Sequence, residues 1–163
     1  MRIIGVDPGT VCCGYGIVDV EGKGRPLVYV TCGDVRMNNR KPLPERLKIL
    51  YDSLGSVIVE YSPDHLCLEK IFYHKSIRSS LTLGSARGII MLLAAKNSIP
   101  VYEYNSTELK MALTGFGRAE KRQVQEMVFR VINIDRPPES VSEDSSDALA
   151  LAICHINTSH ELK

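Results

Sequence analysis

Four acidic residues occupy positions that suit a metal-dependent reaction on phosphate. Asp7 and Glu69 each close a short apolar run, whereas Asp144 and Asp147 lie three residues apart near the start of a predicted helix. A phosphodiester is itself an anion, so carboxylates beside it require divalent cations between the like charges. The four side chains together therefore predict metal-dependent cleavage of nucleic acid.

The two apolar runs predict buried strands. The run IIGV precedes Asp7, which a Pro-Gly turn follows, and the run HLCL precedes Glu69. Apolar runs without alternation are typical of strands buried on both faces of an α/β sheet. Because ligands gather at the carboxyl ends of parallel strands, we expect Asp7 and Glu69 to meet at one edge of the sheet.

A helix over residues 141–158 is predicted to carry the other two acids. Ser140 is its expected N-cap, with Glu143 reaching back to complete a capping box. Helical spacing then puts Asp144 and Asp147 on one face, where the positive end of the helix dipole favours their ionised forms. Taken singly, acids in a first helical turn usually just complement the dipole, so the argument depends on the whole set.

Five motifs, in order along nearly the whole chain, carry a resemblance to a known family. They are IIGVDPG near the start, LEKIF around Glu69, then LTLGSARG, GRAEKRQVQEMV and DSSDALALAICH. On these motifs the chain resembles the RuvC family of bacterial Holliday junction resolvases. The resemblance implies a ribonuclease H-like fold, a homodimer, magnesium-dependent nicking of four-way junction DNA, and RuvA and RuvB, the branch-migration proteins, as partners.

The resemblance also assigns the active site. By position, Asp7, Glu69, Asp144 and Asp147 are the catalytic acids and the ligands of two Mg²⁺ ions, which Mn²⁺ could replace. We expect Asp7 to bridge the ions, Glu69 and Asp144 to hold the ion that activates water, and Asp147 to complete the other shell. Residues 10–14, TVCCG, depart from the usual family pattern at this turn.

Basic and aromatic side chains form a candidate DNA-binding group. Residues 70–130 hold 10 basic and 4 acidic side chains, a net charge of +6, whereas residues 1–69 hold 8 and 9 and residues 131–163 hold 2 and 6. Clustered cations attract phosphates, although any single lysine more often solvates a helix face. The predicted DNA-binding residues are Phe72, Lys75, Arg78, Lys110, Arg118, Lys121 and Arg122.

Three of these residues have more specific expected roles. The resemblance matches Phe72 to an aromatic residue that assists the junction at its branch point, where stacking on an unpaired base contributes roughly 1 to 3 kcal/mol. Without the family, a packed or interface phenylalanine is about equally favoured. Lys110 and Lys121 match family lysines near the scissile phosphate, where either could stabilise developing charge.

Small residues at helical spacing predict a helix interface. Ser80, Gly84 and Gly88 form a flat strip on the helix expected over residues 79–97, and such a strip lets another helix come close. The resemblance places this helix in the dimer interface. Packing onto the protomer's own sheet is the alternative.

The order of the predicted elements indicates an α/β fold. With the resemblance, it gives a ribonuclease H-like, mixed five-stranded sheet of order 3-2-1-4-5 flanked by helices. Strands are expected near residues 2–7, 14–20, 27–36, 65–69 and 99–104. Helices are expected near residues 43–61, 79–97, 106–114, 119–133 and 141–158.

Size and composition agree with one nuclease domain over residues 1–163. The chain is 44% hydrophobic, enough for one substantial core, and no apolar run approaches the roughly 20 residues that span a bilayer. We therefore expect a cytoplasmic protein without a membrane partner. Five cysteines without metal-finger spacing are interpreted as reduced core thiols.

Three other functions remain open from the residues alone. An actin-like or Hsp70-like ATPase shares the strand, acid and glycine-rich hairpin of residues 4–16, but it needs two related domains, for which 163 residues are too few. A junction-binding module that cuts nothing is the second alternative. A ribonuclease H-like nuclease acting on another nucleic acid, such as an RNA and DNA hybrid, is the third.

Overall fold

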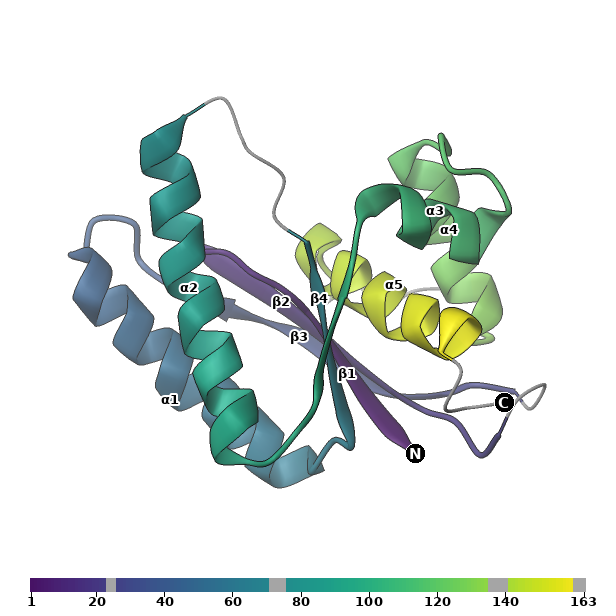
Figure 1. Ribbon diagram of the computed structural model, residues 1–163, viewed down its shortest axis with the longest axis horizontal. Coiled ribbons are helices and arrows are strands. Elements are labelled where there is room, and N and C mark those ends of the chain that lie inside the picture. The colour runs from purple at the N-terminus through teal and green to yellow at the C-terminus, as the bar shows by residue number, and fades with distance from the viewer. Residues whose placement is uncertain (23–25, 71–75, 135–140, 160–163) are drawn as a thin grey trace.

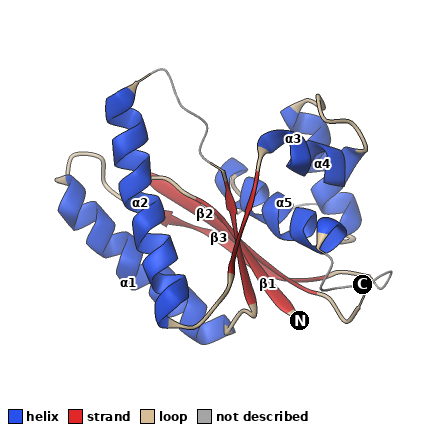
Figure 2. Cartoon of the chain, viewed as in Figure 1, coloured by secondary structure: helices blue, strands red, loops and turns tan. Residues whose placement is uncertain are grey.

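A mixed five-stranded sheet with helices on both faces is the frame of the molecule (Figures 1 and 2). The structure is a computed structural model that describes residues 1–22, 26–70, 76–134 and 141–159. The strands are β1 (Arg2–Asp7), β2 (Cys12–Asp19), β3 (Val28–Arg36), β4 (His65–Glu69) and β5 (Val101–Tyr104). The helices are α1 (Leu43–Tyr61), α2 (Ile77–Lys96), α3 (Ser106–Thr114), α4 (Lys121–Val131) and α5 (Glu143–Thr158).

The strand order is β3-β2-β1-β4-β5, as predicted. The strands β1, β2 and β3 form an antiparallel meander, whereas β4 runs parallel to both β1 and β5. The predicted β2 started two residues too late, because Cys12 already pairs with Arg36 on β3. Helix α2 likewise starts earlier than predicted, at Ile77, since the Ser76 side chain caps its first turn.

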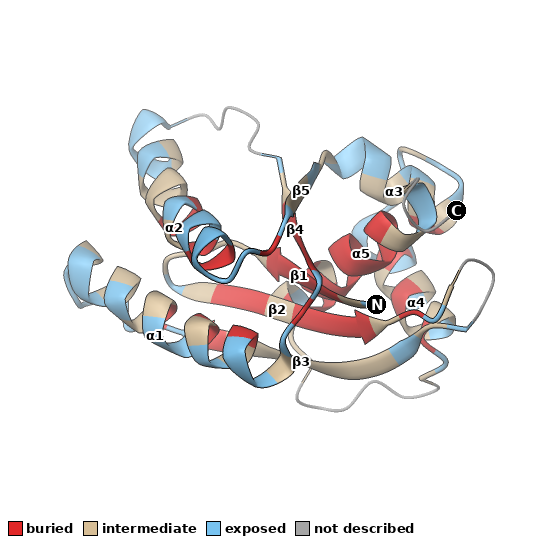
Figure 3. Ribbon diagram, turned by 60° about the horizontal axis from the view of Figure 1, so that its bottom comes forward, coloured by how far each residue is buried: buried red, intermediate tan, exposed pale blue. Residues whose placement is uncertain are grey.

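Two hydrophobic cores lie on opposite faces of the sheet. Helices α1 and α2 cover one face, and α3, α4 and α5 lie on the other (Figure 1). The strand β1 and the helix α5 are buried along most of their length (Figure 3). Alternation along β1 sends Ile4 and Val6 into the first core and Ile3 into the second. Asp7 has the parity of Ile3, and therefore points to the face that α5 covers.

Helix α5 lies unusually close to the sheet because glycines face it. A Cβ atom added at Gly5 would come within 1.9 Å of the Ala148 carbonyl oxygen, and one at Gly14 within 2.2 Å of the Asp144 carbonyl. A side chain at either position would therefore push the helix away. The backbones of β1 and β2 thus set the height of the first turns of α5.

The predicted capping box of α5 was wrong. Ser140 lies outside the described residues, and the N-cap is Ser142, whose side-chain oxygen accepts a hydrogen bond from the Ser145 backbone N–H at 3.0 Å. In return, Ser142 N–H donates to Ser145 Oγ at 2.9 Å. Glu143 is the first residue of the helix and forms an ion pair with Lys121.

The cysteines agree with the prediction of reduced thiols. All five are free: Cys13, Cys67 and Cys154 are buried, and Cys12 and Cys32 are partly buried. Within the described ranges, none of the helices combines the length and the apolar character that a bilayer crossing needs.

Candidate active site

Asp7 and Glu69 end neighbouring parallel strands, so the predicted meeting at one sheet edge is confirmed. Val6 on β1 is in register with Leu68 on β4, and the next residue of each strand is the acid. Cys67 packs on the α5 side of the sheet, and Glu69, two residues later, has the same parity. Both carboxylates therefore project towards the space beside α5.

A cleft of about 290 Å³ joins three of the four predicted acids. Asp147 reaches it from the second turn of α5, and Asp7 and Glu69 reach it from the strand ends. Lys110 and Lys121 enter from α3 and α4. The remaining described lining consists of Ser106, Leu109, Val124 and Leu151. The apolar residues in this lining lower the local polarity and strengthen the charge interactions inside the cleft.

The protonation of Asp7 reflects this crowding of negative charge. Burial, and then the carboxylates of Asp147, Asp144 and Glu69, together raise the pKa of Asp7 to about 7. Burial also raises the pKa of Asp147, although its ion pair with Lys121 opposes this effect. A cation bound among these carboxylates would stabilise their ionised forms.

Lys121 forms an ion pair with one of the acids of the cleft, Asp147. Its Nζ lies 2.8 Å from Asp147 Oδ2 and also forms an ion pair with Glu143. Burial disfavours the ammonium charge, but the hydrogen bonds to the two carboxylates outweigh it and raise the pKa of Lys121. The amine is therefore held in its charged form at the mouth of the cleft.

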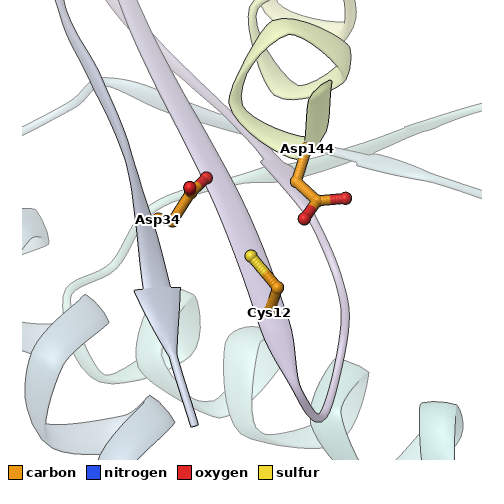
Figure 4. Close-up of side chains that lie close together, drawn as sticks. All are labelled: Cys12, Asp34 and Asp144. Carbon is orange, nitrogen blue, oxygen red and sulfur yellow. The ribbon is translucent and has the colours of Figure 1, made fainter. Parts of the chain in front are cut away.

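Asp144 lies to one side of the cleft, beside Cys12 and Asp34 (Figure 4). The Cys12 sulfur and one oxygen of each carboxylate lie within 4.8 Å of one another. Burial, and then a hydrogen bond to Asp144, raise the pKa of the Cys12 thiol to about 12. Asp144 therefore has close neighbours on β2 and β3 that the sequence argument did not include.

Arg87 on α2 bonds to the backbone of Glu69, and the sequence did not predict this contact. It is almost fully buried, donates to the Glu69 carbonyl oxygen, and forms an ion pair with Glu103 on β5. A signal existed in the sequence, because Arg87 is the one charged residue between positions 79 and 95. A lone charge in an apolar helix is seldom left without a partner.

The other predicted DNA-binding residues are placed less specifically. Phe72 and Lys75 lie outside the described residues. Arg78 and Arg118 are exposed, at the start of α2 and in the turn before α4. Arg122 points into solvent and pairs with Glu126, one turn along the same helix, at 2.9 Å.

The strip of small residues on α2 faces outward. A Cβ atom added at Gly84 or Gly88 would meet no described atom within 4 Å, so these positions do not pack on the protomer's own sheet. Ile77 and Leu81, on the same face, are 80% and 69% exposed. This surface, the α2 strip, consists of Ile77, Ser80, Leu81, Gly84 and Gly88.

Comparisons with known proteins agree with this geometry. A family profile described as "Crossover junction endodeoxyribonuclease RuvC" matches residues 3–155. The proteins of that name from Syntrophotalea carbinolica and Cupriavidus metallidurans are 46% and 45% identical to this chain. The alignments cover 98% and 96% of this chain, and 96% and 84% of the relatives.

Solved structures give the same result. The Thermus thermophilus RuvC structure superposes with a TM-score of 0.87 at 29% identity, covering 96% of this chain and 94% of that one. T. thermophilus RuvC in complex with a Holliday junction substrate superposes with a TM-score of 0.86 at 25% identity, with the same coverage. The fold is therefore the ribonuclease H-like fold of RuvC, and the chain belongs to the RuvC family of crossover junction endodeoxyribonucleases.

Proposed function

We propose that this chain resolves four-way DNA junctions by paired, symmetric nicks in homologous recombination and DNA repair. The observation that carries the proposal is the cleft in which Asp7, Glu69 and Asp147 converge with two lysines in a member of this family. Residues 1–163 act as a single nuclease domain, since both cores share one sheet.

The donors fit hard divalent cations. Asp7, Glu69 and Asp147 offer only oxygen atoms to the cleft, which suits Mg²⁺ or Mn²⁺. The raised pKa of Asp7 agrees with this, because burial and then the neighbouring carboxylates disfavour its charged form, which a bound cation would stabilise. Two Mg²⁺ ions held by Asp7, Glu69, Asp144 and Asp147 would supply an activated water and neutralise charge on the phosphate.

The protein's own groups then orient the reaction. Asp7, on the central strand, lies between Glu69 on one side and the acids of α5 on the other. This position would suit a carboxylate that is a ligand of both ions. Water attacks phosphorus, the bond from phosphorus to the 3′ oxygen breaks, and that oxygen leaves with a proton. The products carry a 5′-phosphate and a 3′-hydroxyl. The ammonium groups of Lys110 and Lys121 stabilise negative charge as it develops on the phosphate.

A homodimer supplies the second active site. The α2 strip is exposed, apolar at Ile77 and Leu81 and flat at its glycines, which suits close packing against a second copy of the same helix. A two-fold axis through this contact would present two identical clefts to symmetry-related strands of a junction. RuvA and RuvB as partners, and a cytoplasmic location, stay predictions that the family membership supports.

Cleavage of a labelled four-way junction tests the function. The purified protein is incubated with the junction and Mg²⁺, and in parallel with a linear duplex of the same sequence and an RNA and DNA hybrid. We expect nicks at symmetric positions in two opposite strands of the junction, and intact duplex and hybrid. Equal cutting of the hybrid would favour the broader ribonuclease H-like nuclease. Tight junction binding without nicks in Mg²⁺ or Mn²⁺ would favour the non-cleaving module.

A further inference from the structure

Asp34 on β3 is connected to the start of α5 by a bond that spans 108 residues of sequence. Its Oδ1 accepts a hydrogen bond from Ser142 Oγ at 2.5 Å. The Asp34 side chain is only 8% exposed, and its other oxygen, Oδ2, accepts from Arg36 at 3.2 Å. A buried carboxylate with two donors holds its place far more firmly than a surface acid.

The partner hydroxyl of Asp34 is also the N-cap of α5. Ser142 Oγ accepts from the Ser145 backbone N–H at 3.0 Å while it donates towards Asp34. A hydroxyl has one hydrogen to give and two lone pairs to accept with, so the bond to Asp34 fixes the hydrogen and leaves a lone pair directed at the helix. The cap and the link to β3 therefore reinforce each other.

The helix end held in this way carries Asp144 in its first turn and Asp147 in its second. Asp144 and Asp147 lie two and five residues after Ser142, and the Asp144 backbone lies directly over Gly14 of β2. The glycine contact sets the height of the helix above the sheet, whereas a slide of the helix along the sheet would be opposed by a bond directed sideways. The bond from β3, on the far side of β2, opposes that movement.

We propose that Asp34 is a positioning residue, which fixes the first turn of α5 and thereby places Asp144 and Asp147 for divalent cations. This inference rests on the proposed function, because it assigns Asp34 a part in that reaction. Asp34 is not among the residues that line the cleft, although its carboxylate lies beside Asp144; its hydrogen bond to the start of α5 runs through Ser142.

Position and charge can be separated by substitution. Asp34→Ala removes both the acceptor and the charge, and Asp34→Asn removes the charge but keeps an oxygen acceptor for Ser142. Groups that hold metal ligands in place typically contribute about 10- to 100-fold in metal affinity or activity. We expect Asp34→Ala to raise the Mg²⁺ concentration for half-maximal junction cleavage by at least about tenfold, and Asp34→Asn to raise it by less than about threefold.

The controls separate positioning from general stability. Asp52→Ala removes an exposed acid of α1 that pairs with Lys48 at 2.5 Å, and it should keep wild-type metal dependence. Junction binding without divalent cations, measured on all variants, should stay within about twofold of wild type, because the basic surface is intact. Loss of folding alone would lower the active fraction without moving the Mg²⁺ midpoint.

A second set keeps the inference testable if Asp34→Ala fails to fold. Asp34→Leu, which removes the acceptor but fills the space of the side chain, Ser142→Ala and their combination form a cycle in which a shared bond makes the double variant no worse than Ser142→Ala. An unchanged Mg²⁺ midpoint in Asp34→Ala, equal effects of Asp34→Asn and Asp34→Ala, or independent effects in the cycle would each overturn the positioning role. Absence of junction cleavage by the wild-type protein would instead overturn the proposed function, and the positioning role with it.

Discussion

The ammonium of Lys121 lies 2.8 Å from the Asp147 carboxylate and also pairs with Glu143. This contact joins α4 to α5 across the mouth of the cleft. Lys121→Ala should lower the rate of junction cleavage by about 100-fold, since a preorganised positive group at a developing charge contributes roughly that much. Arg122→Ala is the matched control, because Arg122 is exposed and pairs only locally with Glu126. Similar losses in the two variants would mean that Lys121 contributes merely to general DNA attraction.

Asp7→Asn should abolish cleavage and yet stabilise the metal-free protein at pH 8. The wild-type carboxylate is ionised at that pH among Glu69, Asp144 and Asp147, whereas an amide carries no charge to repel. Replacing the buried, charged carboxylate should raise the free energy of unfolding by an amount on the order of 2 kcal/mol, after allowance for solvent screening. Thermal unfolding in a metal chelator should therefore show a midpoint higher by about 4 to 8 °C. A lower midpoint would show that Asp7 is not destabilised by its neighbours.

The metal requirement should depend on pH through Asp7. Its pKa is raised to about 7, so the folded protein takes up a proton that the unfolded chain, with the ordinary value of 3.8, has released over the same range. Metal-free stability therefore falls as pH rises from about 4 to about 7, and the ionised form that binds cations becomes populated. We expect the Mg²⁺ concentration for half-maximal cleavage to drop by about tenfold between pH 6 and pH 8. A constant midpoint in buffers of equal ionic strength would contradict this coupling.

Gly14→Ala should lift α5 from the sheet. The added carbon would overlap the Asp144 carbonyl at 2.2 Å, and backbone cannot move aside as a flexible side chain can. Overpacking of this kind costs about 1 to 3 kcal/mol, and cleavage should fall further because the acids shift. Gly55→Ala is the control, since its new carbon would meet only the end of the Leu93 side chain at 3.3 Å. Denaturant unfolding and junction cleavage are measured on both variants.

Leu81→Glu should convert a dimer into monomers. Leu81 is 69% exposed on the α2 strip, so a charge there leaves the isolated fold intact but opposes burial against a second copy. Sedimentation analysis should show about half the wild-type mass, and junction cleavage should change from paired to single nicks. Lys48→Glu, on the exposed side of α1, should leave the mass unchanged. A wild-type mass for Leu81→Glu would remove the strip from the interface.

The bounds of helices and strands were predicted well where residues near in sequence determine them. The bounds of α1, β4 and α3 agree with the prediction, because each has its own stop and start signals. Helix α3, for example, begins with a capping box of Asn105 and Glu108 and ends at Gly115 in a left-handed conformation. The parity of β1 and β4 likewise follows from the two-residue repeat of a strand, which is why Asp7 and Glu69 could be brought together from the sequence.

The start of α5 could not be predicted in that way. Both Ser140 and Ser142 have cap chemistry, and Glu143 made Ser140 the better local choice. The structure uses Ser142, whose hydroxyl also bonds to Asp34, a residue 108 positions away. No local window contains that contact. The same reason hid Asp34 and Cys12, whose roles depend on what the fold brings beside them, whereas Arg87 was marked in the sequence as a lone charge and only its partners were not.

Helix α5 meets the sheet main chain against main chain at Gly5 and Gly14, with no side chain between them. Packing through side chains shifts by tenths of an ångström whenever a lineage exchanges one apolar residue for another. Where two backbones are in direct contact, the spacing between helix and sheet does not change with the size of a side chain. Core residues can therefore be exchanged for others of different size while the start of α5 keeps its height above the sheet. Asp144 and Asp147 then keep their positions relative to Asp7.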